Sequence, residues 1–146
     1  MIVTALPRLP HMTLDGPLPL AAAHLPAAER RILARHHANA LLVGAVPSTE
    51  AVLLALEPLL LDPLALWHPG EPLRLPERGG TLVLRNVGRL PPADQNALAD
   101  WFNRDPYQTQ VISTSPSPIF PLVERGRFCE PLYYRLNTVY LELKDG

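Results

Sequence analysis

The segment Gly44 to Ala51, with the sequence GAVPSTEA, has the surroundings of a site that could bind phosphate. It follows the apolar run Ala40–Val43 and leads into a second apolar run. This order predicts a strand, a turn that contains glycine, and a helix capped by Ser48 or Thr49. A phosphate-binding loop has the pattern GxxxxGK[ST]. Its glycines let backbone N–H groups converge on phosphate, its lysine supplies charge, and its hydroxyl binds magnesium.

The side chains of this segment are unfavourable for phosphate. Aligned on Gly44, the second glycine, the lysine and the hydroxyl residue of the pattern are replaced by Thr49, Glu50 and Ala51. Pro47 also removes one N–H donor. Because Glu50 adds direct repulsion, we expect the chain not to bind Mg-ATP in the ordinary mode and to need no cofactor.

Short apolar runs elsewhere predict the sheet that must position this segment. Thr81–Leu84 (TLVL) has no polar alternation and follows a pair of glycines, which is typical of a strand covered on both faces. Pro92–Phe102 places Ala97, Leu98 and its aromatic residues on one helical face, and a further apolar run follows it, so a βαβ crossover is predicted. The predicted fold class is a three-layer α/β/α domain with a mostly parallel sheet of four or five strands.

The predicted elements follow the same patterns. The strands are expected at Ala40–Val43, Leu64–Trp67, Thr81–Leu84, Gln110–Thr114 and Thr138–Leu143, the last at an edge of the sheet. The helices are expected at Pro26–His37, Thr49–Leu60, Ala93–Asn103 and Glu130–Leu136.

Three motifs occur in order between Leu73 and Leu143: GGTLVLRNVGRLPPADQNALADWF, QVISTS and ERGRFCEPLYYRLNTVYLEL. Together they resemble the second half of the AAA+ core of the sigma-54-dependent transcription activators, the bacterial enhancer-binding proteins. The string LYYRLN at Leu132–Asn137 is the most distinctive part, because no general rule for helices or strands requires it. The resemblance implies a P-loop NTPase-like fold (an AAA+ α/β subdomain) and an ATP-binding transcription regulator that interacts with sigma-54.

The resemblance also maps catalytic positions, and the residues at these positions differ from those of the family. Arg85 replaces the aspartate that would hold magnesium, and Asn86 replaces the glutamate that would activate water. Pro116 falls near the polar sensor position. We therefore expect no catalytic residue, no metal site and no ATP hydrolysis.

The family uses arginines of its last motif to reach the nucleotide of a neighbouring subunit. Cys129 replaces the first of them and Arg135 remains at the second. Arg135 is either a retained arginine finger or a structural residue whose stem packs beside Tyr133 and Tyr134.

The replacements at positions 50 and 85 suggest that these two residues interact with each other. In an intact site the loop lysine and the strand-end aspartate lie close together, and here the signs are exchanged as Glu50 and Arg85. We hypothesise a salt bridge between them that closes the nucleotide site. The alternative is that both residues changed independently and point to water. A separation above about 6 Å would exclude the bridge.

Composition predicts one soluble, cytoplasmic domain. The chain has 146 residues, 47% of them apolar, a net charge of −1 and a single cysteine. This balance does not favour direct contact with nucleic acid or a membrane, and the start lacks the pattern of a signal peptide. Residues 1–20 contain four prolines and are expected to form an extended arm before a domain at 21–146.

Two features of the sigma-54-dependent activators have no counterpart in this sequence. Only about a dozen residues separate Leu64–Trp67 from Thr81, where the activators insert a helix and the GAFTGA loop that grips the sigma factor. The helical lid that follows the last strand in the family is also missing from the sequence. We therefore expect no direct remodelling of sigma-54.

Three functions remain open. The first is a non-catalytic pseudo-ATPase that binds an unidentified protein through a surface near Glu124–Arg135, where Arg125 and Arg127 are expected to be exposed. The second is a nucleotide sensor that binds without hydrolysis. The third is a transcription regulator of the family type that binds ATP and interacts with sigma-54. A homo-oligomer is compatible with each of them.

Overall fold

Five short apolar strands form one sheet in the computed structural model, which describes residues 26–143. The strand order is β2-β3-β4-β1-β5, and every neighbouring pair is parallel. The predicted three-layer fold is confirmed, with a sheet that is wholly parallel. The expected arm at residues 1–20 lies outside the described residues. The strands are β1 Ala40–Val43, β2 Leu64–Trp67, β3 Thr81–Leu84, β4 Gln110–Ser115 and β5 Val139–Glu142.

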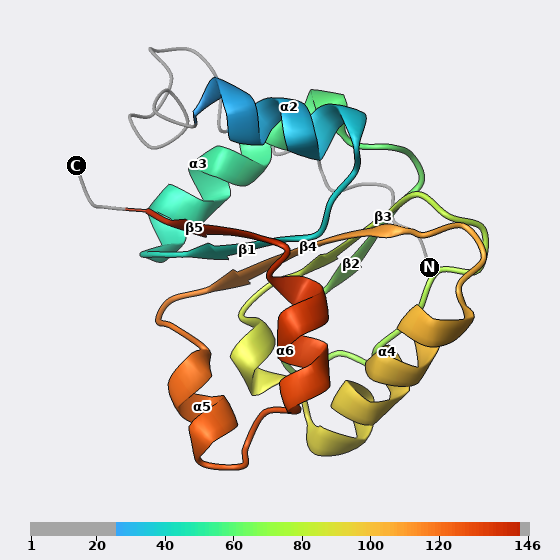
Figure 1. Cartoon of the computed structure of the whole chain (residues 1–146), viewed down its shortest axis with the longest axis vertical. Helices are drawn as coiled ribbons and strands as arrows, with labels where there is room; N and C mark the ends of the chain where they lie inside the picture. Colours follow the sequence, from blue (N-terminus) through green and yellow to red (C-terminus); the bar gives the residue numbers. More distant parts are fainter. Residues whose placement is uncertain (1–25, 144–146) are drawn as a thin grey trace.

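Helices cover both faces of the sheet, with α2 and α3 on one side and α4, α5 and α6 on the other (Figure 1). Side chains alternate across a strand, so β1 contributes to two cores. Leu41 and Val43 pack into the core that α4 and α6 cover, and Ala40 and Leu42 pack into the core that α2 and α3 cover. The helices are α2 Ala27–Arg35, α3 Val46–Leu56, α4 Pro92–Arg104, α5 Phe120–Glu124 and α6 Glu130–Leu136.

Most of the expected elements are present, some of them with shifted ends. The strands at Ala40–Val43, Leu64–Trp67 and Thr81–Leu84 have the predicted bounds. The helix expected at Thr49–Leu60 begins three residues earlier, at Val46, and ends in the 3-10 turn η2 at Glu57–Leu59. Ala97, expected on the apolar face of α4, is exposed. The short helix α5 and the 3-10 turn η3 (Val87–Arg89) were not predicted.

Residues 68–80, between β2 and β3, form no helix or strand. This agrees with the expected lack of an inserted helix at this point. The segment is held in place by the indole of Trp101, whose Nε1–H donates to Pro76 O at 2.9 Å. It ends at Gly80, where φ is +92° and a Cβ would lie 2.2 Å from Pro63 O, so only glycine fits.

The carboxyl ends of β1, β3 and β4 lie side by side at one end of the sheet, and we call this end the strand-end edge. Val43 is level with Ser115, and Leu84 is level with Ser113. The connection from β1 runs through α3 on one face, whereas β4 continues into α5 and α6 on the other face. Ligands of open α/β sheets bind in the crevice outside such strand ends. Of the positions singled out from the sequence, Gly44, Arg85, Asn86 and Pro116 follow these strand ends.

Candidate functional site

The turn between β1 and α3 is too short to wrap around phosphate. It consists of Gly44 and Ala45, and α3 begins at Val46. The backbone N–H groups of Ser48 and Thr49 both donate to Ala45 O, at 2.9 and 3.0 Å. The N–H groups that a phosphate loop would direct at a ligand are therefore already paired within the first turn of the helix.

The predicted cap of this helix is wrong. The N-cap position is Ala45, and Pro47 lies in the first turn, where its missing N–H costs nothing. Thr49 is 3% exposed, and its hydroxyl donates to Val46 O at 3.1 Å. Neither Ser48 nor Thr49 caps the helix, because both lie inside it.

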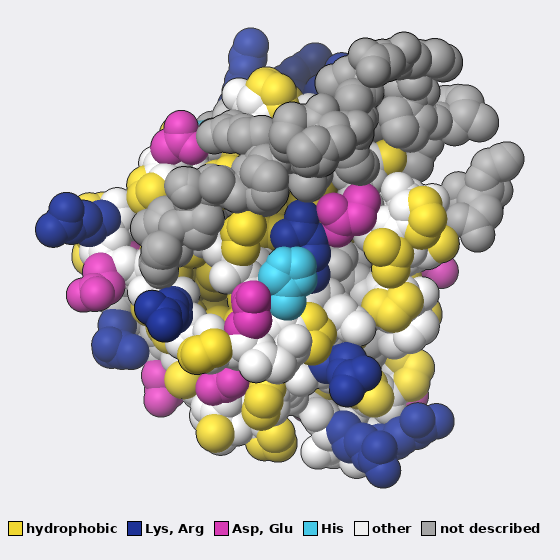
Figure 2. Space-filling view, turned by 180° about the vertical axis from the view of Figure 1, so that it is seen from behind, with side chains coloured by type: hydrophobic (Ala, Val, Ile, Leu, Met, Phe, Trp, Pro, Cys, Tyr) yellow, Lys and Arg dark blue, Asp and Glu magenta, His cyan; other side chains and the backbone are white. Residues whose placement is uncertain are grey.

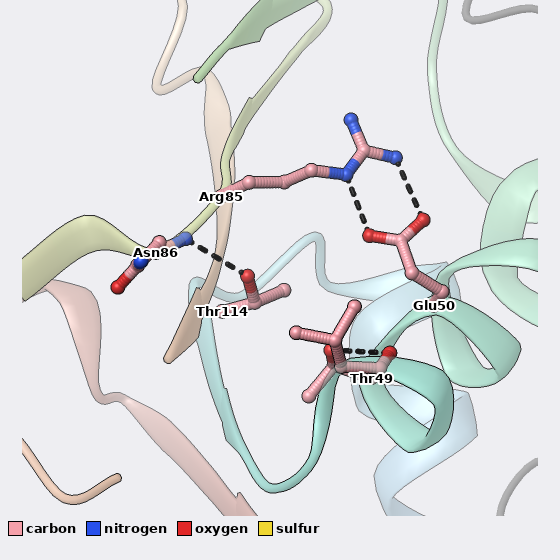
Figure 3. Close-up of polar contacts among 6 residues, drawn as sticks. Thr49, Glu50, Arg85, Asn86 and Thr114 are labelled. Atoms are coloured by element: carbon pink, nitrogen blue, oxygen red, sulfur yellow. Dashed lines mark hydrogen bonds and ion pairs between the residues drawn. The ribbon is translucent and has the colours of Figure 1, made fainter. Parts of the chain in front are cut away.

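Glu50 and Arg85 form a bidentate ion pair (Figure 3). Arg85 Nε donates to Glu50 Oε2 at 2.7 Å, and Arg85 Nη2 donates to Glu50 Oε1 at 3.1 Å. The hypothesised salt bridge is confirmed, and both distances lie far below the limit that would have excluded it. Parallel N–H···O bonds of this kind are among the stronger charge-assisted contacts in proteins.

The ion pair is largely shielded from water. The side chain of Arg85 is 13% exposed and that of Glu50 is 22% exposed. Arg85 follows β3, and its backbone N–H donates to Trp67 O at 3.1 Å, so the residue is fixed at the sheet edge. Glu50 is fixed by the first turns of α3, and the adjacent Ala51 is 5% exposed. The pair therefore ties α3 to the carboxyl end of β3.

Asn86 lies beside the ion pair in the left-handed region, with φ of 52° and ψ of 56°. Its backbone N–H donates to the hydroxyl of Thr114 on β4 at 3.1 Å (Figure 3). Asparagine tolerates this conformation better than most residues. The backbone thus provides a structural reason for asparagine at position 86.

Pro116 is exposed at the end of β4 and is not part of the ion pair. The neighbouring Ser115 hydrogen bonds through its hydroxyl to the backbone of Ser117. Of the predicted site residues, Glu50 and Arg85 are the pair whose side chains hydrogen bond to each other within the described part of the chain.

The guanidinium of Arg135 contacts the last turn of α4. Its guanidinium carbon lies 4.8 Å from the ring centroid of Phe102. The Nη1 and Nη2 atoms donate to Asn103 Oδ1 at 3.2 Å and Phe102 O at 3.3 Å. The guanidinium of Arg135 therefore lies against α4, over the ring of Phe102, and the packing of its stem beside Tyr133 and Tyr134 stays a prediction.

Gln95 organises the last motif and was not identified from the sequence. It is 4% exposed, and its Nε2 donates to Leu90 O at 2.9 Å and to Arg127 O at 3.2 Å. Its Oε1 accepts a bond from Cys129 N at 2.7 Å. One buried amide therefore positions the segment that carries Arg125 and Arg127, whose side chains are exposed as predicted.

Two cavities lie away from the Glu50–Arg85 pair. One, of about 380 Å³, is at the opposite edge of the sheet and is lined by His37, Asn39, Thr109 and Arg135, among others. The other, of about 370 Å³, lies beside β2 and is lined by residues such as Pro63, Leu75 and Arg78. Neither cavity is lined by Gly44, Glu50, Arg85 or Asn86.

The chain is similar to known regulators over part of its length. The model of the family described as the sigma-54 interaction domain matches residues 59–145. The HTH-type transcriptional regulatory protein TyrR of Enterobacter agglomerans is 32% identical over 76 residues, which cover 44% of this chain and 15% of that protein. The chain thus spans a small part of that relative.

Solved structures share the fold at low identity. NtrX from Brucella abortus in complex with ATP is 17% identical, with a TM-score of 0.62 over 90% of this chain and 39% of that one. The P-loop NTPase domain of the sigma-54 transport activator from E. coli is 16% identical, with a TM-score of 0.55 over 73% of this chain and 97% of that one. These matches agree with the parallel sheet, and the family model covers more than half of the sequence. The chain belongs to the sigma-54 interaction domain family, and its α/β domain has the P-loop NTPase fold.

Proposed function

We propose that this domain is a catalytically inactive member of its family, a pseudo-ATPase that acts by binding protein. The Glu50–Arg85 ion pair carries the proposal. It places a carboxylate and a guanidinium in contact where the family resemblance implies a lysine, an aspartate and the magnesium nucleotide between them.

Nucleotide binding at this edge would meet two costs. A phosphate close to α3 would face the carboxylate of Glu50 unless the ion pair opened, and opening it would leave a partly buried charge unpaired, at about 1 to 3 kcal/mol. Little would offset this cost, because the N–H groups of Ser48 and Thr49 already donate within the helix. We therefore propose that the domain works without a nucleotide cofactor.

Hydrolysis would also lack its chemical groups. Arg85 presents a cation where a carboxylate would hold magnesium, and the amide of Asn86 cannot accept a proton from water. The nearby hydroxyl of Thr114 accepts a bond from the backbone of Asn86. This arrangement supports a domain that is not an enzyme.

The segment from Glu124 to Arg135 is the surface that we propose for a protein partner. Arg125 and Arg127 are exposed there. The segment is fixed to α4 by the hydrogen bond from Gln95 to Arg127 O and by the contact of Arg135 with Phe102. A surface with exposed arginines on a fixed backbone suits a partner that presents carboxylates. The relationship to transcription activators suggests a partner in transcription regulation.

Other surfaces give less support to nucleic acid or membrane as partners. On the face shown in Figure 2, basic and acidic side chains are interspersed with apolar ones, and the described residues form no basic stripe there. No helix of residues 26–143 is long and apolar enough to cross a membrane.

Calorimetric titration with ATP and ADP, with and without magnesium, tests the proposal. We expect no binding up to about 1 mM nucleotide, which corresponds to an affinity weaker than about 4 kcal/mol. The melting temperature, measured in parallel, should not change, which excludes binding without heat. Micromolar affinity would overturn the proposal in favour of a nucleotide sensor, and turnover of ATP would favour a regulator of the family type.

A further inference from the structure

The outer edge of β5 carries backbone groups that no neighbouring strand of the described residues pairs. Among the strands of residues 26–143, β5 is the last in the sheet order and pairs with β1 alone. Val139 N donates to Asn39 O at 2.9 Å and Leu143 N donates to Val43 O at 2.7 Å. Since backbone groups alternate along a parallel strand, the N–H and C=O groups of Tyr140 and Glu142 point away from β1. An open edge of this kind is a template for another strand.

Aromatic side chains gather beside this edge. Tyr140 is 39% exposed, Tyr134 is 55% exposed and Phe120 is 39% exposed. Tyr133 connects two of them, since its ring centroid lies 5.2 Å from that of Tyr134 and 5.8 Å from that of Phe120, and Tyr140 lies on the strand that follows α6. Tyrosine at this level of exposure is typical of protein interfaces. We call these four residues the aromatic patch.

The edge is complementary to itself. When two β5 strands are aligned antiparallel about Leu141, Tyr140 of each copy lies opposite Glu142 of the other. The outward N–H and C=O groups then face one another as two hydrogen-bonded pairs, each of which exchanges two bonds. On one face, the tyrosine hydroxyl can donate to the glutamate carboxylate. On the other, the two Leu141 side chains meet.

We propose that two copies of this chain associate through antiparallel pairing of their β5 strands, so that the two sheets join across a twofold axis. Such an interface uses the same patch on both copies and closes on itself. The register that places Tyr140 opposite Glu142 keeps the two Glu142 carboxylates from lying directly opposite each other, which would be unfavourable. The aromatic patch of each copy would lie beside the new strand pair. Neither the pairing nor its test depends on whether a nucleotide binds at the Glu50–Arg85 edge.

Sedimentation of the 146-residue chain between about 10 µM and 1 mM tests the proposal, with the concentrations chosen to reveal weak association. We expect a monomer–dimer equilibrium, and Tyr140→Pro should raise the dissociation constant of the dimer at least tenfold. The N–H of Tyr140 faces away from β1, so proline removes a bond to the second copy and none within the sheet. Glu142→Pro provides a second variant by the same reasoning, should the first fail to fold. Tyr107→Ser, which removes an exposed tyrosine outside the aromatic patch, is the matched control and should leave the dimer unchanged.

Hydrogen exchange gives an independent measurement. In the paired state the amides of Tyr140 and Glu142 should become protected as the protein concentration rises. The amide of Leu141, which faces β1, should be protected at every concentration. A monomer at about 1 mM, or a dimer that persists in both proline variants, would overturn the proposal.

Discussion

Arg85, at the end of β3, and Glu50, in the second turn of α3, bind each other through two parallel N–H···O bonds, although they are 35 residues apart in the sequence. The contact joins a helix on one face of the sheet to the edge where three strands end. Its two charges are the reverse of those that the family resemblance implies for a nucleotide site. The same two residues can therefore stabilise the fold and oppose phosphate.

A double-mutant cycle measures the first of these effects. Arg85→Met should destabilise the domain by about 1 to 3 kcal/mol, because it leaves the partly buried carboxylate of Glu50 unpaired. Adding Glu50→Gln should recover part of that loss, with a coupling energy of about 0.5 to 3 kcal/mol. Denaturant unfolding provides the values. Arg125→Met is the control at an exposed arginine, and additive effects of the two substitutions at the pair would show that the contact adds no stability.

Restoring the charges of the family pattern should not restore nucleotide binding. The variant Glu50→Lys/Arg85→Asp keeps an opposite-charge pair and is expected to fold. The backbone N–H groups of positions 48 and 49 remain bonded inside α3. The variant therefore offers phosphate a lysine but no free backbone N–H groups. We expect calorimetry with Mg-ATP to give no dissociation constant below about 1 mM, so that the binding free energy is weaker than about 4 kcal/mol. Micromolar binding would mean that the first turn of α3 unwinds readily and that charge alone keeps nucleotide out.

The sheet could be predicted because its strands are covered on both faces. Runs such as TLVL at Thr81–Leu84 contain no polar alternation, and all four residues are buried. The start of α3 could not be placed in the same way. Aligning the segment with a phosphate loop put the helix start at Thr49, whereas Pro47 already fits a first turn that begins at Val46.

The polar contacts of the site differ in how far the sequence reveals them. Glu50 and Arg85 could be paired because the family resemblance brings their positions together and their charges are opposite. Gln95 gave no such signal, because a glutamine on a helix usually faces water. Its burial depends on the carbonyl of Arg127 and the amide of Cys129, which lie 32 and 34 residues away in the sequence. Only the tertiary structure brings these groups to its side chain.

The left-handed backbone at Asn86 predicts an unusual order of substitutions. Asn86→Gly should be neutral or slightly stabilising, since glycine adopts this conformation without strain. Asn86→Glu, which restores the carboxylate of the family pattern, should cost about 1 kcal/mol because longer side chains disfavour the left-handed region. Thermal unfolding of the two variants checks this order. Equal stability of the glutamate and glycine variants would contradict a backbone origin for asparagine here.

Gln95 should be among the polar residues that tolerate substitution least. Gln95→Leu keeps the volume but leaves Cys129 N–H and two carbonyls without their partner, so a loss of about 2 to 3 kcal/mol is expected. Asn96→Leu, which replaces an exposed amide on the same helix, is the matched control and should change stability by less than about 0.5 kcal/mol. Amide exchange at Cys129 should accelerate in the Gln95 variant alone. Unchanged exchange would show that the buried amide does not hold this segment.

Tyr140 gives the domain a pH dependence in the alkaline range. Its pKa is raised above the ordinary value, first by burial and then by the negative charges of Glu142 and ionised Tyr133. A group whose pKa is higher in the folded state contributes stability that is present below the unfolded pKa, about 10 for tyrosine, and is lost as pH rises through the folded pKa. Stability should therefore decline less steeply above about pH 10 in Tyr140→Phe than in the unmodified chain. The ionisation of Tyr140 can be followed as the difference in tyrosinate absorbance between the unmodified chain and Tyr140→Phe. Its midpoint should lie above about pH 10, and Glu142→Gln should lower that midpoint. A midpoint at or below about 10 would show that the edge of β5 leaves this hydroxyl as free as in an unfolded chain.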